Sequence, residues 1–494
     1  MSVFAFALWI VVTNLWANPS YTAAAPYHAA FLLGGFLLGR RAGAENAALL
    51  FGAALVFALG LAAWAIWQRI GQGAPRAYAL FETPAMLSST INLVLLPGLV
   101  LVAAGRRSAV LAVALIAFSA ALAAAASRGG WLGLAAGGLV AALLARRAGL
   151  RIAWKSAATA CLILALGWLL VTISTPGLQH SVTGSRDLNS SLARLDLYEL
   201  ALKGIAASPP VIGSGYLAFY YLLEPARETI AGYGESITYF VHNDYLQTLL
   251  ELGIPGLAGL LALVALPQAQ AWRAAPALGP DQKPIVVALA AALGSMATHA
   301  LVDFPFYIPV CLLIYGAAAG LLDSLMAAGV GVRLPRVLVV AAATLGFWVL
   351  ATPVAAQAAA GYAHRQWQAA HGESAAYWFE MARRIEPRDW RYHWYAGQFW
   401  YALAQTNYQP DAARLAEAAF AAGYAANPRE VRTLVGRIST HLRLRALLSA
   451  PADNATLLDW ADRALVLAPR DAGVLAVRSL VLLKLHGSLP LELR

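Results

Sequence analysis

The stretch YFVHNDYLQTLLELGIPG, residues Tyr239–Gly256, places a polar triplet directly before a leucine-rich segment. His242, Asn243 and Asp244 stand where the leucines begin to recur at helical spacing, so we expect an apolar helix to start here. Gly253 and the proline two residues later are expected to break that helix. The role of the triplet depends on whether the helix lies in a membrane.

The composition is typical of a polytopic membrane protein. Of 494 residues, 60% are hydrophobic and only 12% are charged, whereas soluble domains carry roughly 25% charged residues. Alanine, leucine, valine and glycine dominate the apolar segments, which favours helices over barrel strands. The two cysteines lie in apolar segments and indicate neither a disulfide framework nor a cysteine metal site. We therefore expect an all-α membrane fold.

About eleven segments are apolar and long enough to approach the roughly 20 residues that a bilayer-spanning helix needs. One further helix, giving twelve, is compatible with the pattern. The expected spans are 2–18, 24–39, 46–67, 86–104, 109–127, 129–145, 152–173, 243–268, 284–301, 305–322 and 336–356.

The basic residues predict the orientation of these spans. Arginines and lysines gather in alternate short loops, as cytoplasmic loops do. This pattern accounts for the net charge of +10 without nucleic-acid binding. It places the N-terminus in the cytoplasm and puts the long loop 174–242 and the tail on the outer face. The basic loops carry Arg40, Arg41, Arg106, Arg107, Arg146, Arg147, Arg151, Arg273, Lys283, Arg333 and Arg336.

The long outer loop contains an amphipathic helix by its pattern. Residues 189–191 (Asn-Ser-Ser) are expected to cap it, and Glu199 with Lys203 forms a favourable pair one turn apart. A Pro-Pro pair at 209–210 stops it. The expected apolar stripe consists of Leu192, Leu195, Leu200 and Ile205.

The tail 357–494 differs in composition from the transmembrane domain 1–356. Pro387, Pro428 and Pro469 recur at intervals of 41 residues, each followed by arginine and, one position later, by an acid. Each follows an alanine-rich helical segment, a pattern that resembles degenerate tetratricopeptide repeats. We expect a helical solenoid on the outer face of the membrane that acts as a binding or scaffolding module rather than a catalytic domain.

Arginines and one histidine remain as candidates for chemistry, because the sequence contains no nucleotide-binding, zinc-protease, serine-hydrolase or DxD motif. Arg128, in SRGGWLGL, is either a charge that reaches the lipid headgroups or a phosphate anchor. Arg194 lies on the amphipathic helix. Arg186 and Arg227 are solvated charges unless they also contact phosphate. All four are candidates for contacting a phosphate group.

His242 is either a capping side chain or a general base. A helix N-terminus disfavours the imidazolium, which would keep the ring neutral and able to accept a proton. Asn243 and Asp244 are expected to cap the helix and orient the ring. His299 and Asp303, four residues apart, are more simply explained as a structural pair than as part of the same site.

Three motifs in one order around the long loop resemble the O-antigen ligase and O-antigen polymerase superfamily of bacterial envelopes. They are SRGGWLGL, SLARLDLYELALKG…PPVIGSGYLAFY and HNDYLQTLLELGIPGL, within residues 75–330. The protein-O-oligosaccharyltransferases share the last of them. The repeat-bearing tail is not part of the family pattern.

The resemblance implies a GT-C-like, metal-independent glycosyltransferase of the bacterial inner membrane, with no cofactor. Its donor would be a glycan on undecaprenyl pyrophosphate, presented at the periplasmic face. The family's loop arginine corresponds to Arg194, its SRG arginine to Arg128 and its histidine to His242. Arginines would then balance the charge of the leaving pyrophosphate, His242 would act as base, and the anomeric centre would invert.

The acceptor stays open among three alternatives. Lipid A–core, as in a ligase, is placed first; another carrier-linked glycan, as in a polymerase, and a protein serine follow. A transporter would be expected to bury ionisable residues at mid-span, and few are found. A scaffold would leave the arginines and His242 unexplained.

Overall fold

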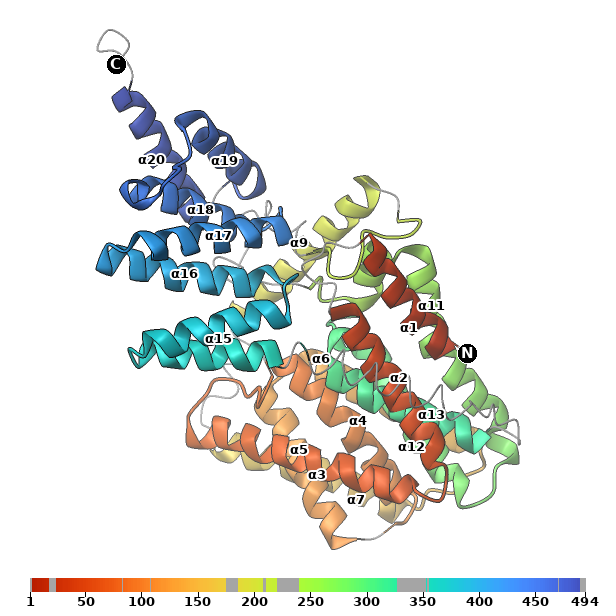
Figure 1. Cartoon of the computed structure of the whole chain (residues 1–494). Helices are drawn as coiled ribbons and strands as arrows, with labels where there is room; N and C mark the ends of the chain where they lie inside the picture. Colours follow the sequence, from red (N-terminus) through yellow and green to blue (C-terminus); the bar gives the residue numbers. More distant parts are fainter. Residues whose placement is uncertain are drawn as a thin grey trace. The chain divides into compact units, whose positions relative to one another are not determined.

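The protein is helical in every part that the structure describes. The computed structural model covers residues 2–16, 24–81, 83–106, 108–174, 185–207, 210–219, 240–326, 352, 355–469 and 471–488, and no strand occurs among them. The chain divides into two compact units (Figure 1). The first unit comprises 1–13, 27–214 and 240–334, and the second comprises 14–26, 215–239 and 335–494.

The helices of the first unit follow the expected spans closely. Each span from 2–18 to 305–322 contains a helix, and the span expected at 336–356 lies almost entirely outside the described residues. Within the described part of the chain, six helices are long and apolar enough to cross a membrane. The predicted number of eleven to twelve spans stays a prediction. The helices are α1 Ser2–Val12, α2 Ala24–Ala42, α3 Ala47–Ile66, α4 Pro84–Ala103, α5 Ala109–Ala125, α6 Arg128–Arg147, α7 Trp154–Ser174, α9 Ser185–Ala207, α11 Asp244–Ala274, α12 Gln282–His299 and α13 Pro309–Met326.

Helix α4 is the most enclosed helix of the first unit, because 94% of the residues in its apolar stretch are buried inside the protein. It packs against α12, which also packs against α6 (Figure 1). Glycines on α6 allow this close packing: a Cβ at Gly130 would lie 2.6 Å from the Ser88 Cβ, and one at Gly137 would lie 2.7 Å from the Ala291 carbonyl oxygen. Small residues at helix contacts are typical of membrane bundles.

Helices α2 and α13 meet through two glycine pairs with the same spacing. Gly35 and Gly39 on α2 face α13, and a Cβ on either would come within 2.1 Å of an α13 carbonyl oxygen. Gly316 and Gly320 on α13 contact α2 in the same way. These reciprocal small-xxx-small motifs let the two backbones touch, the packing that favours helix association in lipid.

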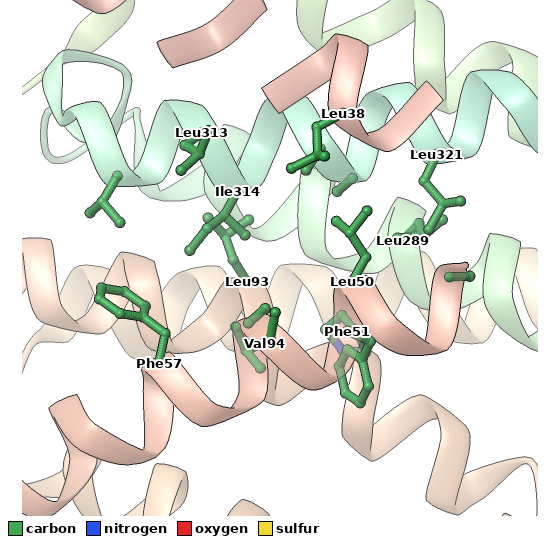
Figure 2. Close-up of a pocket in the computed structure, with 17 residues that line it drawn as sticks. Leu38, Leu50, Phe51, Phe57, Leu93, Val94, Leu289, Leu313, Ile314 and Leu321 are labelled. Carbon is green, nitrogen blue, oxygen red and sulfur yellow. The ribbon is translucent and has the colours of Figure 1, made fainter. Parts of the chain in front are cut away.

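A cavity of about 320 Å³ lies among α2, α3, α4, α12 and α13, and only apolar side chains line it. Leu313 and Ile314 of α13 lie across it from Phe57 of α3 (Figure 2). Such a hollow suits hydrocarbon and holds no group for acid–base or ionic chemistry. A site for chemistry must therefore lie elsewhere in the first unit.

The second unit is a succession of helices in which each packs on the next (cyan to blue in Figure 1). The recurring Pro-Arg-acid motif explains where three of them begin, because the acid caps the following helix. Asp389 accepts a hydrogen bond from the Arg391 N–H at 3.0 Å, and Glu430 accepts one from the Arg432 N–H at 3.2 Å. The helices are 355–368, α15 Gly372–Ile385, α16 Trp390–Asn407, α17 Pro410–Ala426, α18 Val431–Arg443, α19 Asn454–Leu467 and α20 Ala472–Ser488.

The tetratricopeptide-like character of this unit and the boundary at 356/357 stay predictions. What the structure adds is a reason for the 41-residue period. Each proline lies in the turn before α16, α18 or α20, three residues ahead of the helix start. The period therefore marks one helix pair and its turn.

Candidate active site

Helix α9 brings Arg194 and Tyr198 to the site from the long loop. The helix begins at Ser185, so the expectation that residues 189–191 cap it is wrong. The expected apolar stripe is also wrong in register, because Leu195 is 60% exposed while Leu197 and Ala201 are fully buried. The predicted pair of Glu199 and Lys203 is confirmed at 2.6 Å.

With that register, Arg194 and Tyr198 occupy one face of α9, one turn apart. The guanidinium of Arg194 reaches Asp303. The Tyr198 hydroxyl donates to the His242 carbonyl oxygen at 2.9 Å. Helix α9 is thus attached to both sides of the polar cluster around Asp303.

His242 immediately precedes the cap of α11 and is not itself the cap. The Asn243 side chain accepts from the Leu246 N–H at 3.0 Å and caps the helix, as expected for that residue. Asp244, expected to share this role, instead accepts from the Phe306 N–H at 2.8 Å. His242 has a φ of 61°, a left-handed conformation that L-residues seldom adopt and that is often found at functional sites.

Polar side chains of α11 hold the backbone around His242 in place. Gln247 accepts from the Val241 N–H at 2.9 Å and donates to Glu251 at 3.0 Å. The Tyr307 hydroxyl donates to the second oxygen of Glu251 at 2.8 Å. The buried glutamine and glutamate of the HNDYLQTLLELGIPG stretch therefore anchor the residue next to His242.

Asp303 is the centre of the cluster. Its Oδ1 lies 3.2 Å from His242 Nδ1, and its Oδ2 lies 3.4 Å from Arg194 Nη2. The side chain of Asp303 is 4% exposed, that of His242 16% and that of Arg194 26%. The cluster is therefore mostly buried, but a ligand can still reach its histidine and arginine. His299 Nε2 is farther from Asp303, at 4.0 Å, and His299 Nδ1 lies 2.8 Å from the Ser89 hydroxyl.

The charge state of Asp303 follows from these contacts. Burial raises the pKa of its carboxyl, whereas the hydrogen bond with His242 and the charge of Arg194 lower it, and the net direction is downward. The carboxylate is therefore ionised at neutral pH. It can orient the imidazole and balance the guanidinium at once.

Aromatic rings pack around the imidazole and restrict its orientation. Phe304 meets the His242 ring edge to face at 4.9 Å and stacks on Phe240 at 4.0 Å. With Asp303 bound at Nδ1, these contacts leave Nε2 as the ring nitrogen without a contact to the carboxylate. A neutral ring that donates from Nδ1 carries its lone pair at Nε2, where it can accept a proton.

Two glycines join the loop after α9 to the bend of α11. Gly253 has φ 71° and ψ −168°, a conformation essentially restricted to glycine. A Cβ at Gly253 would lie 2.6 Å from the Gly213 nitrogen, and one at Gly213 would lie 2.2 Å from the Glu251 carbonyl oxygen. Gly253 interrupts the helix as predicted, and a second helical segment follows it to Ala274. The GSG turn at 213–215 thus serves close backbone contact.

Gly253→Ala is expected to lower stability by about 1–3 kcal/mol through backbone strain alone, and further through the clash with Gly213. Thermal unfolding in detergent measures this change. Gly138→Ala is the matched control, because a Cβ there meets nothing within 4 Å. Equal melting temperatures for the two variants would contradict the proposed contact.

Arg128 is the first residue of α6, capped by the Ser127 hydroxyl, which accepts from the Gly130 N–H at 3.2 Å. Its side chain is exposed. The next residue, Gly129, packs against His299 and Val302, so the SRG turn lies beside the loop that carries Asp303. The expected site residues Arg128 and His242 therefore lie at the starts of α6 and α11, and Arg194 reaches the loop that carries Asp303 from the middle of α9.

The remaining candidate arginines are not assigned by the structure. Arg186 lies in α9, but its side chain is outside the described residues, as is the whole of Arg227. Within the described ranges, no group of three or more His, Cys, Asp or Glu side chains is arranged to hold a metal ion.

The sequence interpretation underestimated Asp303 and missed Tyr198. Asp303 was assigned to a structural pair with His299, whereas it is closer to His242 and Arg194. Tyr198 follows Arg194 by one helical turn, and that spacing could have indicated a shared face.

These features define a class: a helical, polytopic membrane protein with a sheltered Arg–Asp–His cluster where its helices end. A comparison with protein families identifies the domain more closely. Residues 113–261 match the family model described as O-antigen ligase. The match includes Arg128, Arg194 and His242, and it confirms the resemblance to the O-antigen ligase superfamily over this part of the chain. A comparison with curated proteins finds no match.

Proposed function

We propose that the protein transfers a glycan from undecaprenyl pyrophosphate to lipid A–core at the periplasmic face of the bacterial inner membrane. The family match supports a membrane glycosyltransferase of the ligase or polymerase type. The donor, the acceptor and the orientation of the site in the membrane are parts of the proposal.

The cluster of Arg194, Asp303 and His242 is the observation that carries this proposal. It combines a cation for an anionic leaving group with a base for an acceptor hydroxyl, joined by one carboxylate. Most of the first unit around it is apolar and helical, so a polar cluster of this kind indicates function.

In the proposed reaction, the arginines stabilise the charge that develops on the pyrophosphate. Arg194 contacts Asp303 through a single nitrogen at 3.4 Å, which leaves further N–H groups for phosphate oxygens. Arg128 supplies a second guanidinium from the start of α6, where the helix dipole also favours an anion.

His242 then acts on the acceptor. Its Nε2 accepts the proton of the acceptor hydroxyl as the hydroxyl oxygen attacks the anomeric carbon. The bond to the pyrophosphate breaks with its electron pair on the leaving oxygen, and the anomeric centre inverts. Asp303 stabilises the imidazolium that forms and holds its orientation, as the carboxylate of a catalytic triad does.

Transfer by the purified protein in lipid, measured with a lipid-linked glycan donor and lipid A–core, tests the function. We expect product to form at an undiminished rate in excess EDTA, because guanidinium groups provide the counter-charge. Loss of product that magnesium or manganese restores would contradict the arginine mechanism. If product forms only on a carrier-linked glycan or on a protein, the proposed acceptor is wrong but the proposed transfer mechanism stands.

Arg194→Ala is expected to weaken donor binding as well as turnover, because the pyrophosphate already carries its charge before reaction. A charge-assisted hydrogen bond contributes about 1.5–3 kcal/mol, which corresponds to roughly a tenfold or larger rise in donor Kd. Arg194→Lys should restore only part of it, since a point charge cannot make a bidentate contact. Donor binding and turnover are measured separately.

Lys203→Ala is the matched control for Arg194, since it removes a cation from the same helix at a position that is 70% exposed. It should leave donor binding nearly unchanged. A similar loss in both variants would indicate a general electrostatic effect of α9 and not a contact from Arg194.

A further inference from the structure

The second unit contains a groove of about 380 Å³ between α16 and α18, closed at one end by the start of α20. The volume lies in the range of roughly 300–1,000 Å³ that is usual for small-molecule sites. The lining is mixed: amide, hydroxyl, guanidinium and carboxylate side chains lie beside aromatic and aliphatic ones.

Two glycines and one phenylalanine create the floor of the groove. A Cβ at Gly397 on α16 would lie 2.6 Å from the Phe420 ring, and a Cβ at Gly436 on α18 would lie 2.5 Å from it. The ring of Phe420 is 1% exposed and fills the space between the helices. The two glycines let this ring fit between α16 and α18, and Phe420 and Gly436 both line the groove.

On each of the two helices, lining residues recur at an interval of seven. Helix α16 provides Trp394 and Tyr401, seven residues apart, with Gln398 between them. Helix α18 provides Arg432 and Ser439, also seven residues apart. Seven residues rise about 10 Å along a helix, so planar and hydrogen-bonding groups line a track of that length.

The guanidinium of Arg432 is held in a fixed plane. It lies 4.5 Å from the centre of the Trp390 ring and 5.9 Å from that of Trp394. Glu430 binds its Nε at 2.7 Å. The ion pair and the two aromatic rings therefore keep this side chain in one orientation in the groove wall.

The lining has balanced charge. Glu430 neutralises Arg432, and the lining includes one further cation, Arg443, and one anion, Asp471. An acidic peptide would find no excess of positive charge here. A neutral ligand rich in hydroxyl groups would find both donors and acceptors, together with aromatic faces for its C–H surfaces.

We propose that this groove binds a short neutral oligosaccharide, with sugar rings against Trp394 and Tyr401 and hydroxyl groups bonded to Gln398, Ser439 and Arg443. That such an oligosaccharide belongs to the transferred glycan or to its acceptor rests on the proposed function. The preference for a neutral sugar chain rests on the groove alone.

Binding of the full-length protein in lipid nanodiscs to an array of neutral oligosaccharides, acidic oligosaccharides and acidic peptides tests the proposal. We expect binding to neutral oligosaccharides, with Kd raised at least tenfold in Trp394→Ala and in Gln398→Ala/Arg443→Gln. Tyr377→Ala, which removes an aromatic ring that is 58% exposed on α15, should leave Kd unchanged. Melting temperatures show that each variant is folded.

Binding retained in Trp394→Ala and in the double variant would overturn the assignment, as would the absence of binding to any neutral oligosaccharide. Capture of acidic peptides in place of sugars would replace the ligand with a protein partner and also overturn it. His242→Ala separates the two proposals, because a groove for sugar should bind normally in this variant whether or not transfer occurs.

Discussion

His242→Ala is expected to transfer glycan at least about 10²-fold more slowly than the wild-type protein, the usual size of the loss of a general base. Expression and donor binding should stay nearly normal, because the imidazole contacts Asp303 and not the helix cap. The helix keeps its Asn243 cap in the variant, so stability is expected to change little. Single-turnover transfer with saturating donor measures the effect.

His371→Ala is a suitable control, since His371 is an exposed histidine of the second unit that bonds to Gln366. It should transfer glycan at the wild-type rate. A folded His242→Ala protein with near wild-type turnover would refute the base assignment. The role of His242 would then be structural, in the left-handed turn that precedes α11.

Asp303→Asn is the second substitution with a large expected effect. An amide cannot stabilise the imidazolium or fix the ring as the carboxylate does, so turnover should fall by roughly 10²-fold or more. Because Asp303 acts through His242, the double variant His242→Ala/Asp303→Asn should be little slower than the slower single variant. Additive losses would indicate that Asp303 acts independently.

Turnover and the free energy of unfolding, measured separately in Asp303→Asn, distinguish a positioning role from a structural one. The lowered pKa means that the ionised carboxylate stabilises the fold above the ordinary aspartate pKa of about 3.9, and this contribution is lost only as the pH falls below it. The stability difference from wild type should therefore be present at neutral pH and be lost as the pH falls below about 3.9. Asp281→Asn, whose side chain is 98% exposed, should alter neither turnover nor stability.

Much of the fold could be predicted because membrane helices are recognised from the hydrophobicity of the local sequence. The expected spans coincide with α1 to α7 and α11 to α13 within a few residues at most ends. The beginning of α11 was also predictable, since asparagine before an apolar run is a common cap. Local patterns of this kind need no knowledge of distant contacts.

Arg194 and His242 could be predicted as site residues, but their contacts with Asp303 could not. Arg194 and His242 lie in motifs that resemble a family, whereas Asp303 is 61 residues from His242 and 109 from Arg194 in sequence. Nothing in the local pattern showed that Asp303 would meet them rather than His299, one turn away. The register of α9 failed for a similar reason, because burial of Leu197 and not Leu195 depends on tertiary packing.

Ser214 and Val241, which flank residues 215–240 in the chain, are both tied to α11. On one side the Ser214 N–H donates to the Leu250 carbonyl at 3.0 Å, and on the other the Val241 N–H donates to Gln247 at 2.9 Å. Both ends of the segment are thus tied to the same two turns of one helix. The entropy cost of closing a loop grows slowly with its length. Evolution can therefore lengthen, shorten or replace the segment between these ties while Arg194, Asp303 and His242 keep their places.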